Sequence, residues 1–226
     1  MTVEEPAERQ VLRVGFVPGV TLRKWRTIWD ERYRDVTLQV REVPQAEQRR
    51  VLDDGEVDLC FVRLPLDTDD LQLIPLYQEV PVAWSSKDHP IAVVEELSLA
   101  DLAGEVLLTE VTSDAVQRAA FADAVLLVPL SVARTHSRRD MVHRPVTDAD
   151  PTRIGLAWRV DNDHPWIEDF IGVVRGRTPN SSRGTALTSR DKESGSGERA
   201  SAPKKARPAR AARGGGGANR RRGRRR

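Results

Sequence analysis

Residues 57–62 constrain the fold more than any other stretch of the chain. They are apolar except for Asp58, and a strand without polar alternation is typical of a sheet that is covered on both faces. The segments before it supply matching elements, with strand patterns at 12–17 and 36–40 and helix patterns at 22–34 and 45–54. The resulting β-α-β-α-β order predicts a parallel sheet with helices packed on its faces.

A second, smaller α/β pattern follows the first. The expected strands lie at 71–76, 80–84, 106–108, 124–128, 141–145 and 154–158, and the expected helices lie at 97–102, 114–122, 131–137 and 165–175. Thr21 and Asp114 are placed to cap the helices that follow them. Trp25 and Trp29 belong to one apolar face of the helix over 22–34, which predicts that this helix packs on the core.

The charge balance changes near residue 176. Residues 1–175 carry 20 Lys or Arg and 31 Asp or Glu, whereas residues 176–226 carry 16 and 3. Because large apolar side chains almost cease after Leu187, we expect 177–226 to be a disordered basic tail that buries too little surface to fold. Its final basic residues are predicted to contact nucleic acid phosphates without reading sequence. They are Lys204, Lys205, Arg207, Arg210, Arg213, Arg220, Arg221, Arg222, Arg224, Arg225 and Arg226.

Several classes of protein find no support in the sequence. The first ten residues are acidic and lack the apolar core of a secretory signal, and no run approaches the roughly 18 apolar residues of a membrane span. Cys60 is the single cysteine, so neither a disulfide nor a cysteine metal cluster can form within the chain. Glycine-rich phosphate-binding motifs are missing. We therefore expect a cytoplasmic protein without metal, cofactor or membrane contact.

Four segments together resemble a known family. They are the opening strand LRVGFVPG, the segment VLDDGEVDLCFVRLP, and VPVAWSSKDHPIA followed by LSLADLAGE. In this order and spacing, residues 12–176 resemble the effector-binding (substrate-binding) domain of LysR-type transcriptional regulators. About ten residues precede the first strand, so the resemblance implies a chain that lacks the family's N-terminal helix-turn-helix. Residues 1–11 would be a leader.

The resemblance implies two Rossmann-like lobes, similar to periplasmic binding proteins and joined by crossover strands. Lobe I would comprise about 12–82 and 159–176, and lobe II about 83–158. Residues 80–84 would form the first crossover, and Trp158 with its neighbours the return. Asp123 stands where relatives have a glycine, and the segment between Leu108 and Ala115 is short, so the second lobe is expected to be reduced.

Ligands of open α/β sheets bind at the carboxyl ends of the strands, which places a small-molecule effector between the lobes. The candidate ligand-binding residues are Pro18, Gly19, Val20, Thr21, Arg63, Trp84, Pro129 and Ser131. Arg63 could pair with a carboxylate, which makes a small carboxylate one candidate effector. Two alternatives remain open: Thr21 could serve only as a helix cap, and Arg63 could be a solvated arginine at the end of a strand.

Ser85, Ser86, Asp88 and His89 contain the residue types of a hydrolase triad. Neighbours in one turn rarely converge as a triad requires, so a turn with local hydrogen bonds is the simpler interpretation, and no enzyme is predicted. The sequence favours a sensing module that contacts nucleic acid through its tail and forms homodimers, or heterodimers with LysR-type relatives. The alternative is a scaffold or dimerisation protein, associated with nucleic acid or ribosomes, that no longer binds ligand. The tail could also only solubilise the chain or fold back on its acidic part.

Overall fold

The strand predicted to be buried on both faces is β3 (Leu59–Leu64), and it lies in the middle of the first of two sheets in the computed structural model, which describes residues 10–177. Leu59 and Phe61 point into one apolar cluster, and Cys60 and Val62 point into another. This alternation is the reason for the uninterrupted apolar run, because each face of the strand needs its own covering layer.

The first sheet has the spatial order β2, β1, β3, β9 and β4. Its other strands are β1 (Gln10–Phe16), β2 (Val36–Glu42), β4 (Leu71–Glu79) and β9 (Thr152–Arg159). β1 pairs in parallel with both β2 and β3, as the β-α-β-α-β pattern predicts, whereas β9 is antiparallel to β3 and β4. The sheet is therefore mixed.

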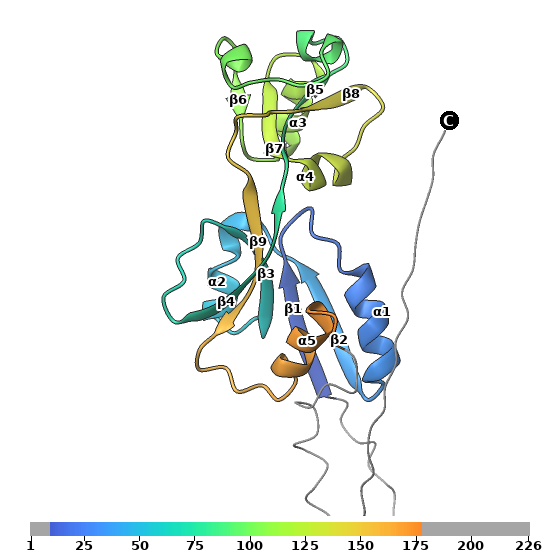
Figure 1. Cartoon of the computed structure of the whole chain (residues 1–226), viewed down its shortest axis with the longest axis vertical. Coiled ribbons are helices and arrows are strands. Elements are labelled where there is room, and N and C mark those ends of the chain that lie inside the picture. Colours follow the sequence, from blue (N-terminus) through green and yellow to red (C-terminus); the bar gives the residue numbers. More distant parts are fainter. Residues whose placement is uncertain (1–9, 178–226) are drawn as a thin grey trace, which may run out of the picture. The chain divides into compact units, whose positions relative to one another are not determined.

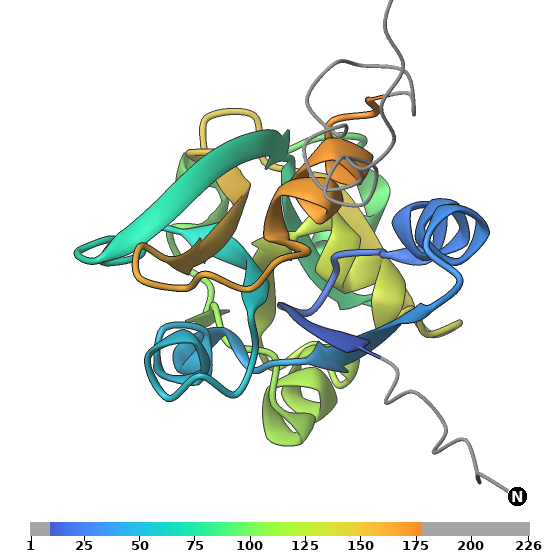
Figure 2. The same ribbon diagram turned by 90° about the horizontal axis from the view of Figure 1, so that it is seen from below.

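Helices cover both faces of this sheet. α1 (Arg23–Arg32) and α5 (Ile167–Val174) pack together on one face, and α2 (Arg50–Asp53), preceded by a 3₁₀ turn at Gln45–Glu47, lies on the other. Figure 2 shows α1 and α5 on the opposite side of the sheet from α2. Trp29 is fully buried and Trp25 stacks on Phe61, which confirms the prediction that this apolar helix face packs on the core.

The second sheet has the spatial order β6, β7, β5 and β8 (Figure 1). Its strands are β5 (Pro81–Ser86), β6 (Leu107–Leu108), β7 (Val125–Pro129) and β8 (Met141–Pro145). α3 (Ser113–Ala120) and α4 (Leu130–Thr135) cover one face, while the 3₁₀ turns Pro90–Val93 and Ala100–Leu102 cover the other. The two sheets define the two expected lobes, and we call them the first lobe and the second lobe.

The first crossing between the lobes is shorter than expected, and the return crossing does not lie at Trp158, which pairs with Gln72 inside the first sheet. β4 ends at Glu79 and β5 begins at Pro81, so Val80 alone joins the two sheets on the first crossing. The return crossing runs through residues 146–151 into β9, which pairs along its length with strands of the first lobe. The expected limits of the second lobe at 83 and 158 therefore need correction, because residues 81–82 belong to the second sheet and 152–158 to the first.

Two predicted helix caps are also wrong. The N-terminus of α1 has no side-chain cap, so the Thr21 hydroxyl does not serve the helix. α3 is capped by Thr112, whose hydroxyl accepts a hydrogen bond from the Ala115 amide, and Asp114 lies inside the helix. None of the helices within residues 10–177 is long and apolar enough to cross a bilayer. The predicted nucleic-acid-binding tail and most of the predicted leader lie outside the described residues.

Candidate functional site

The carboxyl ends of three strands meet at the edge of the first sheet that leads into the second lobe. β1 is parallel to β3, and β3 and β4 are both antiparallel to β9, so all three end at the same edge. The turn 17–20 follows β1, and β4 continues into β5 of the second lobe. This is the edge at which open α/β sheets bind ligands.

A cavity of about 420 Å³ lies at this edge, and we call it the turn cavity. Gly19, Val20 and Thr21 of the predicted ligand-binding set line it. α1 contributes Arg23, Arg26, Thr27 and Asp30, β2 contributes Val40 and Glu42, and the second lobe contributes Thr135 at the end of α4. The cavity thus combines hydroxyl groups with side chains of both charges and receives residues from both lobes.

Gly19 fixes how closely the lobes approach beside this cavity. Its φ of +92° is in the left-handed region that favours glycine. A Cβ atom at this position would stand 2.5 Å from the Ser131 hydroxyl oxygen and 3.0 Å from a methyl group of Val132. Since both contacts come from the first turn of α4, only glycine allows the β1–α1 turn to pack directly against the second lobe.

Arg63 does not line the turn cavity, and it is not a solvated arginine either. Its side chain is 3% exposed and forms an ion pair with Glu79, with 2.8 Å between Nε and Oε2. Its Nη2 donates to the Pro18 carbonyl at 2.8 Å, and its Nη1 donates to Gln45 Oε1 at 3.1 Å. The carboxylate that pairs with Arg63 in this structure is therefore one of the chain itself.

Nothing in the sequence indicated Glu79, which is the buried partner of Arg63. Besides Arg63, its carboxylate accepts hydrogen bonds from the hydroxyls of Ser131 and Thr152. We call Arg63, Glu79, Ser131 and Thr152 the junction cluster. The strand that lies between β3 and β4 is β9, which comes from about 90 residues later in the chain. Spacing along the sequence therefore gave no sign that Arg63 and Glu79 meet.

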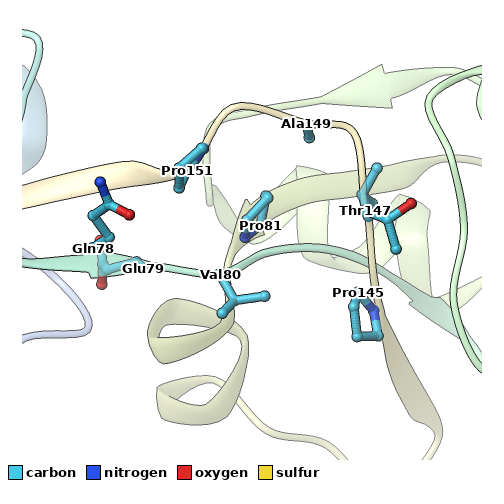
Figure 3. A pocket seen from close by; sticks show the side chains of 9 residues that line it. Gln78, Glu79, Val80, Pro81, Pro145, Thr147, Ala149 and Pro151 are labelled. Carbon is cyan, nitrogen blue, oxygen red and sulfur yellow. The ribbon is translucent and has the colours of Figure 1, made fainter.

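A second cavity, of about 380 Å³, lies between the two crossings, and we call it the crossover cavity. Figure 3 shows Pro81, Pro145 and Pro151 around it, together with Val80 and Thr147. Most of its lining is apolar, and it includes none of the residues predicted to bind ligand. The crossover cavity lies beside Glu79 of the junction cluster and is lined by residues of both crossings.

The fold agrees with comparisons to known proteins. A protein-family model described as the LysR substrate binding domain matches residues 6–125, which is more than half of the chain. The chain belongs to the LysR substrate-binding domain family. The match begins before β1 and ends at the first residue of β7, so it includes the turn 17–20, the first crossing and residues 81–125 of the second lobe.

Curated relatives of this LysR-type domain are transcriptional regulators. The chain is 31% identical to the regulator CatR of Pseudomonas putida over 121 residues, which cover 53% of this chain and 40% of CatR. It is 22% identical to the Hca operon transcriptional activator HcaR of Escherichia coli K12 over 206 residues, covering 75% of this chain and 69% of that protein. The chain thus spans less than half of CatR.

Solved structures agree on the fold. The effector binding domain of BenM with its effector benzoate superimposes with a TM-score of 0.64 at 18% identity, covering 74% of this chain and 91% of that domain. The OxyR regulatory domain from Pseudomonas aeruginosa gives a TM-score of 0.61 at 21% identity, covering 75% of this chain and all of that chain. At these identities the likeness concerns the fold.

The other predicted ligand residues of the LysR-type domain lie apart from the turn cavity. Trp84 is 1% exposed and packs in the second-lobe core, so it faces neither cavity. Pro129 ends β7, and Pro18 contributes its carbonyl to Arg63. Ser131 contacts Glu79 rather than open space. The structure therefore groups Gly19, Val20 and Thr21 around a cavity, and brings Pro18, Arg63 and Ser131 together at the junction cluster.

Three polar side chains of the segment 85–89 have hydrogen-bond partners within the second lobe: Ser85, Ser86 and His89. The Ser85 hydroxyl lies 2.9 Å from the Ala124 carbonyl, and the Ser86 hydroxyl accepts from the Asp88 amide. His89 Nδ1 accepts from the Ile91 amide, so its Nε2 carries the proton and donates to Glu105 at 3.2 Å. These bonds hold a turn at the end of β5, as the simpler interpretation of the sequence expects.

Proposed function

We propose that this LysR-type domain is a small-molecule-sensing regulatory module whose effector binds in the turn cavity. The observation that carries the proposal is the composition of that cavity, which lies at the carboxyl edge of parallel strands and receives residues from both lobes. A ligand that contacts both lobes favours the lobe arrangement in which both sets of contacts form, which is what a sensing domain requires.

The charges of the turn cavity favour a small organic acid. Arg23 and Arg26 lie one turn apart on α1 and offer guanidinium groups to a carboxylate, while Thr21 offers a hydroxyl that the helix does not use. Asp30 and Glu42 can accept hydrogen bonds from donor groups elsewhere on the ligand. A solved protein of the same fold binds benzoate as its effector, which supports a carboxylate among the first compounds to test.

A thermal-shift screen of small carboxylic and aromatic acids, including benzoate, tests the proposal. A compound at 100 times its dissociation constant adds about 2.7 kcal/mol of stability, which corresponds to roughly 5–10 °C in a domain of this size. Thr21→Val and Thr135→Val should reduce the shift, whereas Thr37→Val, an exposed threonine on β2, should leave it unchanged. The absence of any shift would contradict the proposal and favour the scaffold interpretation.

We further propose that the basic tail contacts nucleic acid without reading its sequence. The support is its composition, with eleven Lys or Arg and no acidic residue in the last 24 positions. Six to ten phosphate contacts predict a loss of about 10³ to 10⁵ in affinity between 50 and 200 mM salt. Fluorescence anisotropy with single-stranded and double-stranded oligonucleotides can compare the full chain with a variant in which these residues are serine. Equal affinities at 50 mM salt would contradict the proposal.

Self-association, or pairing with LysR-type relatives, is the third part of the proposed function. A module that senses an effector needs a partner through which to affect transcription, and the solved relative CbnR has been observed in complex with its target DNA. Light scattering coupled to gel filtration should show a dimer of the full chain at micromolar concentration. A monomer across the accessible concentration range would contradict homodimerisation, and co-purification with a relative would then test the heterodimer.

A further inference from the structure

The junction cluster contains a carboxylate that is almost completely removed from solvent. Glu79 is 5% exposed, and its two oxygens accept hydrogen bonds from Arg63, Ser131 and Thr152. The guanidinium of Arg63 is satisfied in turn by Glu79, Gln45 and the Pro18 carbonyl. Within residues 10–177, every buried side-chain nitrogen and oxygen has a hydrogen-bond partner, so the cluster is complete without a ligand.

The members of the cluster come from four separate parts of the fold. Arg63 lies near the end of β3, Glu79 ends β4 at the first crossing, Thr152 begins β9 at the return crossing, and Ser131 lies in the first turn of α4. Glu79 and Thr152 are also partners in the β4–β9 pairing. One carboxylate at the first crossing therefore bonds to β3 of the first sheet, to the return crossing and to the second lobe.

Stability alone does not explain such a pair. Moving two charges out of water costs several kcal/mol per ion, and apolar replacements of similar volume are often as stable. What the pair provides is geometry, since a bidentate guanidinium and two hydroxyls can all donate to the carboxylate in one arrangement only. The hydrogen bond from Ser131 to Glu79 is part of this arrangement. It forms only when α4 of the second lobe packs against the turn at Gly19, as it does in this structure.

We propose that Glu79 is a built-in carboxylate ligand of Arg63 that holds the two lobes together in the absence of effector. It occupies the position that the sequence analysis assigned to the carboxylate of an effector. For the function proposed above, on which this part rests, it follows that an anionic effector binds at Arg23 and Arg26 of the turn cavity and reaches Arg63 only by displacing Glu79.

Chemical rescue tests the proposal without any knowledge of the effector. Glu79→Ala removes a CH₂–COO⁻ unit, which acetate reproduces, and it leaves Arg63 buried without its counter-ion. Because breaking a buried pair is strongly destabilising, the thermal midpoint of the variant should fall by roughly 10 °C. Acetate should raise that midpoint in a saturable manner, whereas acetamide, and chloride at equal ionic strength, should not.

Two controls isolate the Arg63 site. Arg63→Ala combined with Glu79→Ala removes the guanidinium, so acetate should no longer raise the midpoint. Glu56→Ala breaks ion pairs with Arg41 and Arg50 on the surface and opens no buried site, so acetate should act on it as on the unchanged protein. An acetate effect of equal size in all variants, or no effect on Glu79→Ala, would overturn the proposal.

A second variant tests the contact between the lobes should Glu79→Ala fail to fold. Glu79→Gln keeps the size of the side chain and an oxygen that can accept from Ser131, but it does not neutralise Arg63. Amide hydrogen exchange should rise several-fold at residues 80–82, 130–133 and 146–152 and stay unchanged in α2. Unchanged exchange at the crossings would overturn the proposal.

These results are independent of effector binding. Rescue by acetate, with no compound active in the thermal-shift screen, would support the role proposed for Glu79 and reject the proposed sensing function. A compound that binds in the turn cavity, with no rescue by acetate, would support the sensing function and reject the role proposed for Glu79.

Discussion

The two lobes are built on similar sheets but pack different side chains. In the first lobe, Trp25 stacks on Phe61 with 4.7 Å between ring centroids, and Trp29 meets Phe170 edge to face at 5.6 Å. The core cluster under α3 and α4 of the second lobe has one aromatic ring, Trp84, among alanines, valines, a leucine and a methionine. Aromatic rings bury large areas and add pair energy, so we infer that the first lobe is the more stable platform and the second the more adaptable one.

The largest test of this comparison removes one large core side chain from each lobe. Phe170→Ala deletes a fully buried ring that contacts Trp29 and Phe61, and should cost about 3–5 kcal/mol of unfolding free energy. Met141→Ala, on the edge strand β8, should cost about 2 kcal/mol, the lower end of the range for such changes. Urea unfolding followed by tryptophan fluorescence measures both, and an equal or larger cost for Met141→Ala would reverse the comparison.

A smaller test addresses strain at the end of α3 in the second lobe. Ala122 has a φ of +61°, in the left-handed region where a Cβ is unfavourable, and the Asp123 amide closes the helix by donating to the Arg118 carbonyl. The family resemblance implied a glycine one residue later, at the position of Asp123. Ala122→Gly should stabilise the protein by about 0.5–1 kcal/mol. The control Ala120→Gly, at the last residue of α3 where φ is not positive, should not stabilise the protein. A destabilising Ala122→Gly would show that no strain is stored at residue 122.

The pH dependence of the second lobe should include a contribution from His143 on β8. Burial lowers the pKa of His143 below its usual value, and the positive charges of Arg134 and Arg144 lower it further. In the unfolded chain the imidazole takes up a proton as the pH falls below about 6.5. In the folded protein it stays neutral to a lower pH, because its pKa is lowered. Stability is therefore complete above about pH 6.5 and decreases as the pH falls toward the lowered folded pKa. Between pH 7.5 and 5.5, the thermal midpoint of His143→Gln should fall less than that of the unchanged protein. An equal fall in both proteins would contradict a contribution from His143.

The smallest expected effect on stability is at Thr21. Because its hydroxyl caps no helix, Thr21→Val should change the unfolding free energy by less than about 0.5 kcal/mol, as surface substitutions usually do. The same variant should lose most of the thermal shift given by an acid that binds in the turn cavity. A cost above 1 kcal/mol without ligand would mean that Thr21 has a structural role after all.

The structure of the first lobe was easier to predict from the sequence than the limits of the second lobe. The apolar run of β3 and the apolar face around Trp29 predicted the buried central strand and the core helix of the first lobe, because each signal is local and periodic. The place of β9 between β3 and β4 was not foreseen, since nothing in residues 152–159 indicates which strands they join. The limits of the second lobe were misplaced for the same reason.

Prediction of the site failed where it depended on pairing across the sheet. The turn at Gly19 and Thr21 was found from its place after a strand and before a helix, which are neighbours in sequence. The partner of Arg63 was not found, because Arg63 on β3 and Glu79 on β4 are separated by β9. Whether their side chains meet depends on how β9 is aligned with both strands. Trp84 was misplaced because a crossover of five residues was expected, whereas one residue suffices.

Hydrogen exchange on the full chain, with and without a saturating amount of the acid that raises the thermal midpoint most, tests whether a ligand is held where the two lobes meet. We expect slower exchange in residues 19–27 of the first lobe and, in the same experiment, in residues 130–136 of the second. Protection restricted to one lobe, or to segments away from the turn cavity, would contradict binding at this place.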